Sequence, residues 1–414
     1  MAICFPEEYT YRQQKLKTPT GIITLSKEAE EAATIWNKLR PELKADHIVV
    51  NNFDKYFYPL AKCSISSIRD VEMLEVPKKP KNTDTSPKIM IEPPCIFIGR
   101  GAHPLRGMFK QRIKPEDITI NWTSKEKIPD YKWGTVLHDS KITWLLCWLD
   151  PVSQKRKYVY PLNRDYSKSE IEKFALAQKL KRNLLFFRRT NNFNLQTKDI
   201  KRAQLVVSSY LIDLLCIRAG NEKDSDSSDT VGCCTLQVKN ITFLDPQINK
   251  IRLNFLGKDS IEFDKQFSVD KPVWTHLQNF VKHKKPEDDI FDQIDTQQLN
   301  TYISSIVPDV TAKVFRTCHG SSIFQKKLKA QTCKTPKEQY VWANTAAAEL
   351  CNHKKTSSEE QIVLSLTTSR TNYLDPRITV AYCKRSGLPI SSVFSPALMK
   401  KHEWAMETNQ EFKF

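Results

Sequence analysis

Apolar residues recur at helical spacing over much of this 414-residue chain. Ser26 precedes a helical pattern that runs to about Lys38, and its hydroxyl is placed to cap the first turn. A later stretch carries an apolar stripe at intervals of three and four, from Ala203 to Leu215. The same spacing predicts helices over 167–189, 197–217, 311–329 and 337–353, and a mostly helical segment over 371–414 with Trp404 and Phe412 as packing anchors.

A region in the middle of the chain alternates with a period of two instead. Residues 235–243 and 250–255 are predicted to be strands, and 260–263 a third. The adjacent cysteines 233–234 have apolar neighbours, so we expect them in buried strand as well. Lys258 then lies at a turn between two strands. Helices combined with a small antiparallel sheet indicate an α+β fold.

The charge of the chain predicts its partner. A formal net charge of +17 favours a polyanion, although a solvated lysine surface or an anionic membrane would also account for it. The longest apolar runs, such as 142–149, are far too short to span a bilayer, and the N-terminus lacks the apolar core of a signal peptide. Nucleic acid is therefore the predicted partner, without a membrane.

Eleven cysteines are scattered along the chain without any Cys-x-x-Cys pair. This arrangement indicates neither a disulfide framework nor a zinc ribbon. Cys351 and His353 resemble a pair of metal ligands, but no second pair with ligand spacing accompanies them. We expect a reducing, intracellular compartment and no metal site.

Five residues in distinctive local sequences carry the candidate chemistry. They are Arg218 in Arg-Ala-Gly-Asn-Glu-Lys, Lys258 in Leu-Gly-Lys-Asp-Ser, Arg316 in Lys-Val-Phe-Arg-Thr, His353 in Leu-Cys-Asn-His, and Tyr373 in Thr-Asn-Tyr-Leu-Asp-Pro-Arg. A phosphodiester under attack spreads negative charge over its non-bridging oxygens, and guanidinium and imidazole groups can neutralise that charge. A phenol near such cations ionises more easily and can act as the nucleophile, and an ammonium can protonate the leaving oxygen. Taken singly, the cations could be solvated surface charges, His353 a helix cap and Tyr373 a packing residue.

In this order the five segments closely resemble eukaryotic-type DNA topoisomerase IB, over most of the chain and in a compact form. The resemblance implies a multidomain DNA clamp, with a mixed α/β N-terminal cap and a mainly helical, tyrosine-recombinase-like catalytic domain. It also implies a monomeric nuclear enzyme that relaxes supercoiled double-stranded DNA through a 3′-phosphotyrosyl link at Tyr373. Neither ATP nor a cofactor is expected to be required, and a divalent cation would at most stimulate turnover.

The resemblance also assigns domains and DNA contacts. Residues 1–165 correspond to the N-terminal DNA-binding cap, 166–355 to the catalytic core, 356–368 to a short linker and 369–414 to the C-terminal domain. The positions that match DNA-contacting residues of the family are Arg100, Lys223, Thr230, Asp259 and Asn372. Arg100, Asp259 and Asn372 would also line the pocket for camptothecin-type inhibitors. The basic run 77–81 is equally compatible with an exposed linker and a nuclear import signal.

Three departures from the family accompany the resemblance. We expect no long charged N-terminal extension, and the stretch between Leu39 and Ile91 is short. Only 19 residues, 354–372, separate His353 from Tyr373. Fully extended they would reach roughly 60 Å, so Tyr373 can still arrive at the site. The long coiled-coil linker that precedes the tyrosine domain in the family is therefore nearly absent, and with it a basic arm alongside the DNA. Its absence predicts faster strand rotation and release from DNA at lower salt.

Two other functions remain open at this stage. A tyrosine recombinase or integrase uses the same chemistry, but such enzymes usually carry His-x-x-Arg where this chain has Lys313 before Arg316. Their tyrosine also tends to follow the last histidine closely, whereas 20 positions separate the two here. A non-catalytic DNA-binding clamp is the second alternative, although a clamp has no need of Tyr373.

Overall fold

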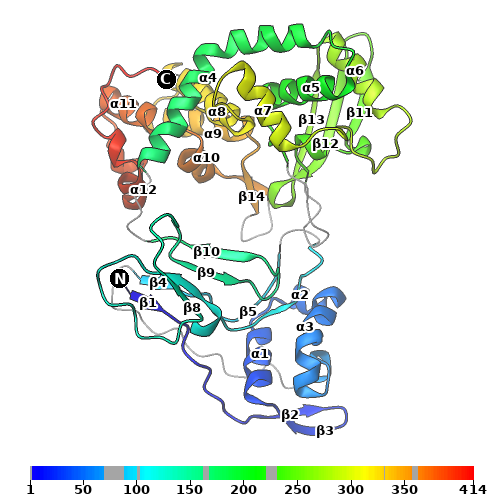
Figure 1. Cartoon of the computed structure of the whole chain (residues 1–414), viewed down its shortest axis with the longest axis vertical. Coiled ribbons are helices and arrows are strands. Elements are labelled where there is room, and N and C mark those ends of the chain that lie inside the picture. Colours follow the sequence, from blue (N-terminus) through cyan, green and yellow to red (C-terminus); the bar gives the residue numbers. More distant parts are fainter. Residues whose placement is uncertain are drawn as a thin grey trace. The chain divides into compact units, whose positions relative to one another are not determined.

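The structure of the protein, a computed structural model, describes residues 2–69, 88–99, 103–161, 167–220, 231–330, 332–356 and 362–414. The described residues up to 161 form one unit, and those from 167 onward form a second (Figure 1). Both units combine helices with small sheets, so the α+β prediction is confirmed at this level. Within the described ranges, no helix has the length and apolar character that crossing a membrane requires.

The first unit is built from short strands and a helical pair. Its strands are β1 (Ala2–Cys4), β2 (Lys15–Thr18), β3 (Gly21–Thr24), β4 (Lys88–Met90), β5 (Cys95–Ile96), β6 (Phe109–Lys110), β7 (Thr119–Asn121), β8 (Thr135–Leu137), β9 (Leu146–Leu149) and β10 (Arg156–Val159). Its helices are α1 (Lys27–Asn37), α2 (Pro41–Ala45), α3 (His47–Ala61), and the 3-10 turns η1 (Ile65–Ser67) and η3 (Pro115–Asp117). Four strands form a sheet in the order β10-β9-β7-β8, and β1 pairs with β4, β2 with β3, and β5 with β6.

Local sequence explains how these elements begin and pack. The Ser26 hydroxyl accepts a hydrogen bond from the backbone of Ala29, which confirms the predicted start of α1. Trp36 of α1 packs against Phe53 of α3, with tilted rings whose centroids lie 4.6 Å apart, and Phe57 continues the same core. Burial of these large apolar side chains stabilises the helical pair more than helix propensity alone would.

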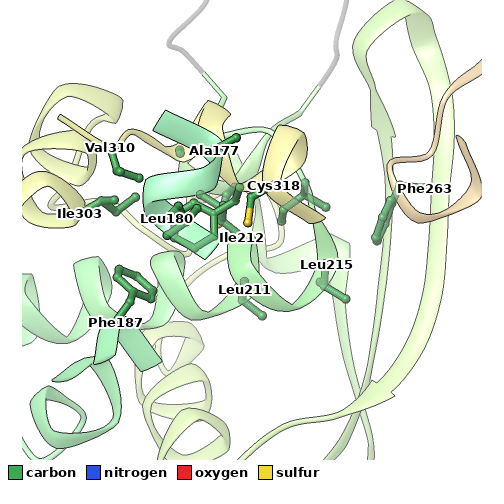
Figure 2. Packing of buried hydrophobic residues seen from close by; sticks show 14 of the residues in the cluster. Ala177, Leu180, Phe187, Leu211, Ile212, Leu215, Phe263, Ile303, Val310 and Cys318 are labelled. Carbon is green, nitrogen blue, oxygen red and sulfur yellow. The ribbon is translucent and has the colours of Figure 1, made fainter. Parts of the chain in front are cut away.

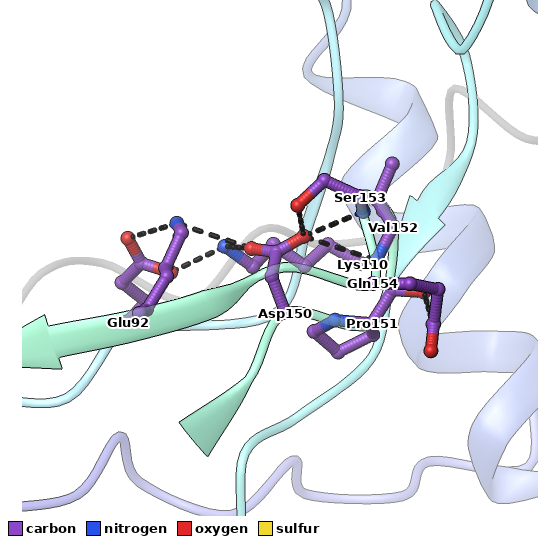
Figure 3. A network of polar contacts seen from close by, with 8 residues as sticks. Glu92, Lys110, Asp150, Pro151, Val152, Ser153 and Gln154 are labelled. Carbon is purple, nitrogen blue, oxygen red and sulfur yellow. Dashed lines mark hydrogen bonds and ion pairs between the residues drawn. The ribbon is translucent and has the colours of Figure 1, made fainter. Parts of the chain in front are cut away.

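A charge network with a buried ion pair at its centre joins four segments of this unit (Figure 3). Lys110 of β6 is 6% exposed and Asp150, just after β9, is 4% exposed, and their charged atoms lie 2.7 Å apart. Glu92 contacts Lys110, and Lys157 of β10 lies 2.8 Å from Glu92 and 3.1 Å from Asp150. Burial alone would lower the pKa of Lys110, but its bonds to Asp150 and Glu92 outweigh burial and raise that pKa. We call this set, Glu92, Lys110, Asp150 and Lys157, the paired charge cluster.

The second unit is larger and richer in helix. Its helices are α4 (Ser167–Asn194), α5 (Ile200–Leu215), α6 (Lys271–Val281), α7 (Thr296–Ile306), α8 (Ala312–Lys329), α9 (Pro336–Leu350), α10 (Leu366–Asn372), α11 (Pro376–Ser386) and α12 (Pro396–Lys401). Its strands are β11 (Ile241–Asp245), β12 (Lys250–Gly257), β13 (Ile261–Ser268), β14 (Lys354–Thr356) and β15 (Ile362–Leu364). Its 3-10 turns are η4 (Cys233–Thr235), η5 (Val238–Asn240), η6 (Lys258–Ser260), η7 (Ile390–Ser392) and η8 (Glu403–Ala405). The strands β11, β12 and β13 form one antiparallel sheet, and β14 pairs with β15.

One core holds the helices of this unit together (Figure 2). Leu180 and Phe187 from α4 meet Leu211 and Ile212 from α5, and Cys318 comes from α8. These side chains are almost completely removed from water, and the predicted apolar stripe of α5 is the part that faces them. The core therefore fixes α5 and α8, the two helices from which Arg218 and Arg316 are presented.

The strand prediction was wrong between residues 235 and 240. Cys233 and Cys234 are buried as expected, but they lie in the turn η4, and β11 begins only at Ile241. The Thr235 hydroxyl accepts from the backbone of Gly232 at 3.0 Å, and the Asn240 side chain does the same for Gln237 at 2.9 Å. These local bonds give the backbone an alternative to strand pairing, which an alternating pattern does not reveal.

Candidate active site

The second unit brings all five candidate residues to one place. Arg218 follows α5, Lys258 opens the turn η6 between β12 and β13, and Arg316 lies within α8. His353 lies between α9 and β14, so the predicted helix ends three residues before it, at Leu350. These four residues line a single pocket. Tyr373, at the end of α10, contacts two of them.

Contacts to Tyr373 join the nucleophile candidate to this pocket. Its ring centroid lies 4.9 Å from the guanidinium carbon of Arg316 and 4.6 Å from the ring centroid of His353. The charge of Arg218 also acts on the phenol and favours its ionised form. The phenol is thus surrounded by the groups that could neutralise a phosphate.

Backbone geometry presents Arg218 to the pocket. Cys216 ends α5 in a left-handed conformation, with φ of 54°, and its N–H donates to the Ile212 carbonyl at 3.0 Å. Two residues later the Arg218 carbonyl accepts from the backbone of Cys233 at 2.8 Å. The segment that carries the arginine is therefore held at both ends.

A pair of glycines explains part of the local sequences around this arginine. A Cβ on Gly220 would lie 2.7 Å from the Cα of Gly232, and a Cβ on Gly232 would lie 2.3 Å from the Cα of Gly220. Gly220 also has a φ of +83°, a conformation that side chains disfavour. The two backbone segments can approach this closely only because neither glycine has a side chain.

Arg316 is a buried cation with neutral partners. It is 5% exposed, and its two terminal nitrogens donate to the carbonyls of Cys216 and Cys351, each at 3.0 Å. Its Nη2 atom also donates to Nε2 of His353 at 2.7 Å. The Nε atom has no hydrogen-bond partner among the described residues, and no described carboxylate forms an ion pair with this guanidinium. Its positive charge is therefore not cancelled locally and acts on neighbouring groups.

His353 is held neutral in this environment. Only 3% of it is exposed, and burial, followed by the charges of Arg316 and Arg218, lowers its pKa to about 3. Its Nδ1 atom lies 2.7 Å from the hydroxyl of Ser369 on α10. Both ring nitrogens are thus engaged, one by an arginine and one by a serine.

The same two arginines favour the ionised form of Tyr373. Burial raises the pKa of the phenol, but the charges of Arg316 and Arg218 and the bond from Arg218 outweigh burial and lower it. This direction agrees with the positive field expected from the sequence. Ionisation of the phenol makes it a better nucleophile at a given pH.

Two backbone contacts position the tyrosine. The Ser321 hydroxyl on α8 donates to the carbonyl of Tyr373 and accepts from the backbone of Asp375, both at 3.0 Å. Asp375 also caps α11, with its side chain accepting from Arg377. Since Ser321 lies five residues after Arg316, one helix positions both the cation and the nucleophile.

A hairpin brings Tyr373 next to His353. The strands β14 and β15 pair in antiparallel register from Lys354 and Leu364 to Thr356 and Ile362, and Ser365 then donates to the His353 carbonyl at 2.7 Å. The chain therefore doubles back and enters α10 directly, instead of running extended as the sequence allowed. Residues 357–361, between the two strands, lie outside the described residues.

The other predicted DNA contacts are only partly covered by the structure. Asn372 is exposed on α10, and its side chain donates to the Thr368 carbonyl at 3.2 Å. The backbone of Asp259 belongs to η6, directly after the exposed Lys258. Arg100, Lys223 and Thr230 lie outside the described residues, as does the basic run 77–81. Over the part of the chain that the structure describes, no group of three or more His, Cys, Asp or Glu side chains is arranged to hold a metal ion.

Sequence reasoning missed Ser321 and Ser369, which contact the predicted residues. Ser369 lies four residues before Tyr373, one turn earlier on the same helix, and this spacing was a usable signal for it. Ser321 had no such signal, because serine is common on helices and its contact is to a distant backbone.

Three family matches together cover residues 80–414 of the chain. Residues 160–376 match the family described as "Eukaryotic DNA topoisomerase I, catalytic core". Residues 80–161 match "Eukaryotic DNA topoisomerase I, DNA binding fragment", and residues 345–414 match "C-terminal topoisomerase domain".

Curated relatives with this name are found in plants and animals. The chain is 34% identical to "DNA topoisomerase 1 beta" of Arabidopsis thaliana, over 78% of this chain and 45% of the relative. It is 34% identical to human "DNA topoisomerase 1", over 78% of this chain and 54% of the relative. The chain thus spans about half the length of the curated relatives that it matches. On these matches and the five-residue site, the chain belongs to the eukaryotic DNA topoisomerase I family.

Proposed function

We propose that this chain is a type IB DNA topoisomerase, which relaxes supercoiled double-stranded DNA without ATP. The observation that carries the proposal is the position of Tyr373 against Arg316 and Arg218, neither of which forms an ion pair with a described carboxylate. A phosphodiester group is an anion of the right charge for this pocket. The phenol beside it is already biased toward ionisation.

The reaction follows from these positions. The Tyr373 phenol, ionised by loss of its proton to water, attacks the phosphorus through its oxygen; a new phosphorus–oxygen bond forms, and the bond to the 5′ oxygen breaks. Lys258 supplies the proton that this leaving oxygen requires, and Arg218, Arg316 and His353 stabilise the charge on the non-bridging oxygens. The product is a 3′-phosphotyrosyl ester with a free 5′ hydroxyl.

Rejoining is the reverse reaction. The 5′ hydroxyl attacks the ester after the free strand has rotated, and the phenol leaves. Because the ester conserves the energy of the original bond, no nucleotide is consumed. The cations of the chain do what metal ions do in many phosphoryl-transfer enzymes, so we propose that activity persists in EDTA and that divalent ions at most stimulate turnover.

The wider arrangement is part of the same proposal. The two units would form a clamp on the duplex, with residues 1–165 as the cap, 166–355 as the tyrosine-recombinase-like core and 369–414 as the tyrosine domain after the short linker 356–368. Arg100, Lys223, Thr230, Asp259 and Asn372 would contact DNA. A monomeric nuclear enzyme that camptothecin-type inhibitors trap on DNA agrees with the family and with the net charge of +17.

Plasmid relaxation tests the proposal directly. Wild type in EDTA without ATP should relax a supercoiled plasmid, and Tyr373→Phe should not. Tyr58→Phe is the matched control, because Tyr58 is 54% exposed and lies in α3, outside the pocket. Equal relaxation by wild type and Tyr373→Phe would refute the nucleophile assignment, and binding without relaxation by wild type would favour a clamp. Strand exchange between paired sites would favour a recombinase.

A further inference from the structure

The hydrogen bonds of His353 determine where its single ring proton lies. Arginine has no acceptor atom, so Nε2 must accept the bond from Arg316 and carries no proton. The ring is neutral at pH 7, as its lowered pKa requires, so the proton lies on Nδ1. Nδ1 then donates to the Ser369 hydroxyl at 2.7 Å.

This tautomer is the wrong one for the proposed reaction. A phosphate oxygen that takes the place of Arg316 beside Nε2 would meet a lone pair and be repelled. To stabilise the transition state, Nε2 must carry the proton and donate it in a hydrogen bond. The proton on Nδ1 must then be lost, and Nδ1 must accept a hydrogen bond in its place.

A hydroxyl satisfies both tautomers, because it can accept from Nδ1 or rotate and donate to it. A carbonyl or carboxylate at the same place could only accept, and would keep the proton on Nδ1. Ser369 is completely buried, and the structure gives Nδ1 no other hydrogen-bond partner among the described residues. The Ser369 carbonyl also accepts from the backbone of Tyr373 at 2.9 Å and of Leu374 at 3.1 Å, so the residue is fixed to the nucleophile.

We propose that Ser369 is a positioning residue whose hydroxyl lets His353 exchange tautomers when a DNA phosphate binds. Nδ1 releases its proton to water, Nε2 takes one from water, and the Ser369 hydroxyl turns to donate to Nδ1. The ring stays neutral throughout, and no proton is gained or lost overall. This inference rests on the proposed function, because it requires a phosphate in the pocket.

Cleavage kinetics in a double-mutant cycle test the inference. We expect Ser369→Ala to slow single-turnover cleavage of a nicked duplex about tenfold, the order of effect of one buried hydrogen bond in an active site. In the His353→Ala background the same change should alter the rate less than twofold. Thr367→Ala is the matched control, since Thr367 is an exposed hydroxyl on α10, and it should leave the rate unchanged. Equal losses from Ser369→Ala in both backgrounds would mean a purely structural role and overturn the inference.

A second measurement separates this inference from the proposed function. Nitrogen chemical shifts of ¹⁵N-labelled histidine, assigned with His353→Ala, should show the Nδ1–H tautomer in the free protein. In a complex of Tyr373→Phe with duplex DNA, they should show Nε2–H. The second step needs DNA binding but no cleavage, so it can succeed even if wild type fails to relax DNA. An Nε2–H ring in the free protein, or an unchanged ring on DNA, would overturn the role of Ser369 while leaving the relaxation result intact.

Discussion

Two buried cations, one in each unit, have opposite surroundings. Lys110 is 6% exposed and Arg316 is 5% exposed, so both have lost nearly all contact with water. Lys110 is paired with the carboxylates of Asp150 and Glu92, whereas Arg316 has two carbonyls and a neutral imidazole. The first arrangement cancels the charge of Lys110 and joins neighbouring strands. The second leaves the charge of Arg316 without a carboxylate partner among the described residues.

The comparison shows why burial alone does not identify a functional cation. A buried charge without a counter-charge costs free energy, so a fold retains one only where another need outweighs that cost. The two cations differ in whether their own pKa is shifted by neighbours or whether they shift the pKa of neighbours. Carboxylates raise the pKa of Lys110, whereas Arg316 itself lowers the pKa values of His353 and Tyr373.

The strongest way to break this comparison is to remove Arg316. We expect Arg316→Ala to reduce the rate of DNA cleavage on the order of 10²-fold or more, because one preorganised donor to the transition state is lost. The free energy of unfolding should change little, since the loss of three hydrogen bonds is offset by removal of an unpaired buried charge. Arg385→Ala, an exposed arginine on α11, is the control for cleavage in the same assay. A large drop in stability with little loss of rate would place Arg316 with Lys110 as a structural cation.

The reciprocal change removes Lys110. Lys110→Met should destabilise the first unit by about 3 kcal/mol, because Asp150 then stays buried with only Lys157, the Ser153 hydroxyl and backbone donors. Amide hydrogen exchange in β9 and β10 during urea unfolding measures this loss. Lys114→Met, at an exposed lysine, controls for the change in charge. Unaltered exchange in Lys110→Met would show that the paired charge cluster contributes nothing to stability.

The pH dependence of cleavage sharpens the comparison further. Arg218 and Arg316 lower the pKa of Tyr373, so removal of Arg218 must raise that pKa. The rate of Arg218→Gln should therefore rise with pH over a range above that of wild type, and its deficit should be smaller at pH 9 than at pH 7. A deficit that is the same at every pH would assign Arg218 to phosphate binding alone. Single-turnover rates across a pH series at saturating DNA provide the measurement.

The smallest expected effect concerns His402, a buried base without a hydrogen-bond partner among the described residues. His402 is completely buried beside Phe394, and neither ring nitrogen has a hydrogen-bond partner in the described structure. Burial, and then the charge of Lys401, lowers its pKa to about 4. The unfolded chain, with a histidine pKa of about 6.5, binds more protons in the interval between those values. Stability from this group is therefore complete above that interval and is lost as the pH falls through it, by about 2 kcal/mol between pH 7 and pH 5.

His402→Phe should remove this pH dependence while filling the same space. Thermal unfolding at pH 7 and pH 5 should differ less for the variant than for wild type. A residual difference is expected, because His353 also has a lowered pKa and remains in place. An identical pH response in the variant and wild type would show that His402 is not a buried neutral base.

Many helices of both units followed from the sequence for identifiable reasons. Caps such as Ser26 and the apolar stripe of α5 are local signals, and they predicted helices correctly. The five candidate residues came from the order of distinctive segments. The structure places four of them around one pocket and Tyr373 against Arg316 and His353. Whether each has the proposed role remains a prediction.

The misses share a physical cause. The turns over 233–240 depend on side-chain bonds from Thr235 and Asn240 that compete with strand pairing. The roles of Ser321 and Ser369 depend on which distant group lies opposite each hydroxyl. Such partners are set by tertiary packing, and a periodic pattern contains no information about them.

The β14–β15 hairpin fixes the two ends of the segment between His353 and Tyr373 independently of the length of that segment. Its ladder and the bond from Ser365 to the His353 carbonyl hold the two ends together, whatever number of residues the tip contains. The free-energy cost of closing a longer flexible loop grows only logarithmically, by about 0.6 kcal/mol for each doubling. A lineage can therefore lengthen or shorten the chain at this point without rebuilding the chemistry beside it. The hairpin is therefore a position at which residues can be inserted or removed without displacing His353 or Tyr373.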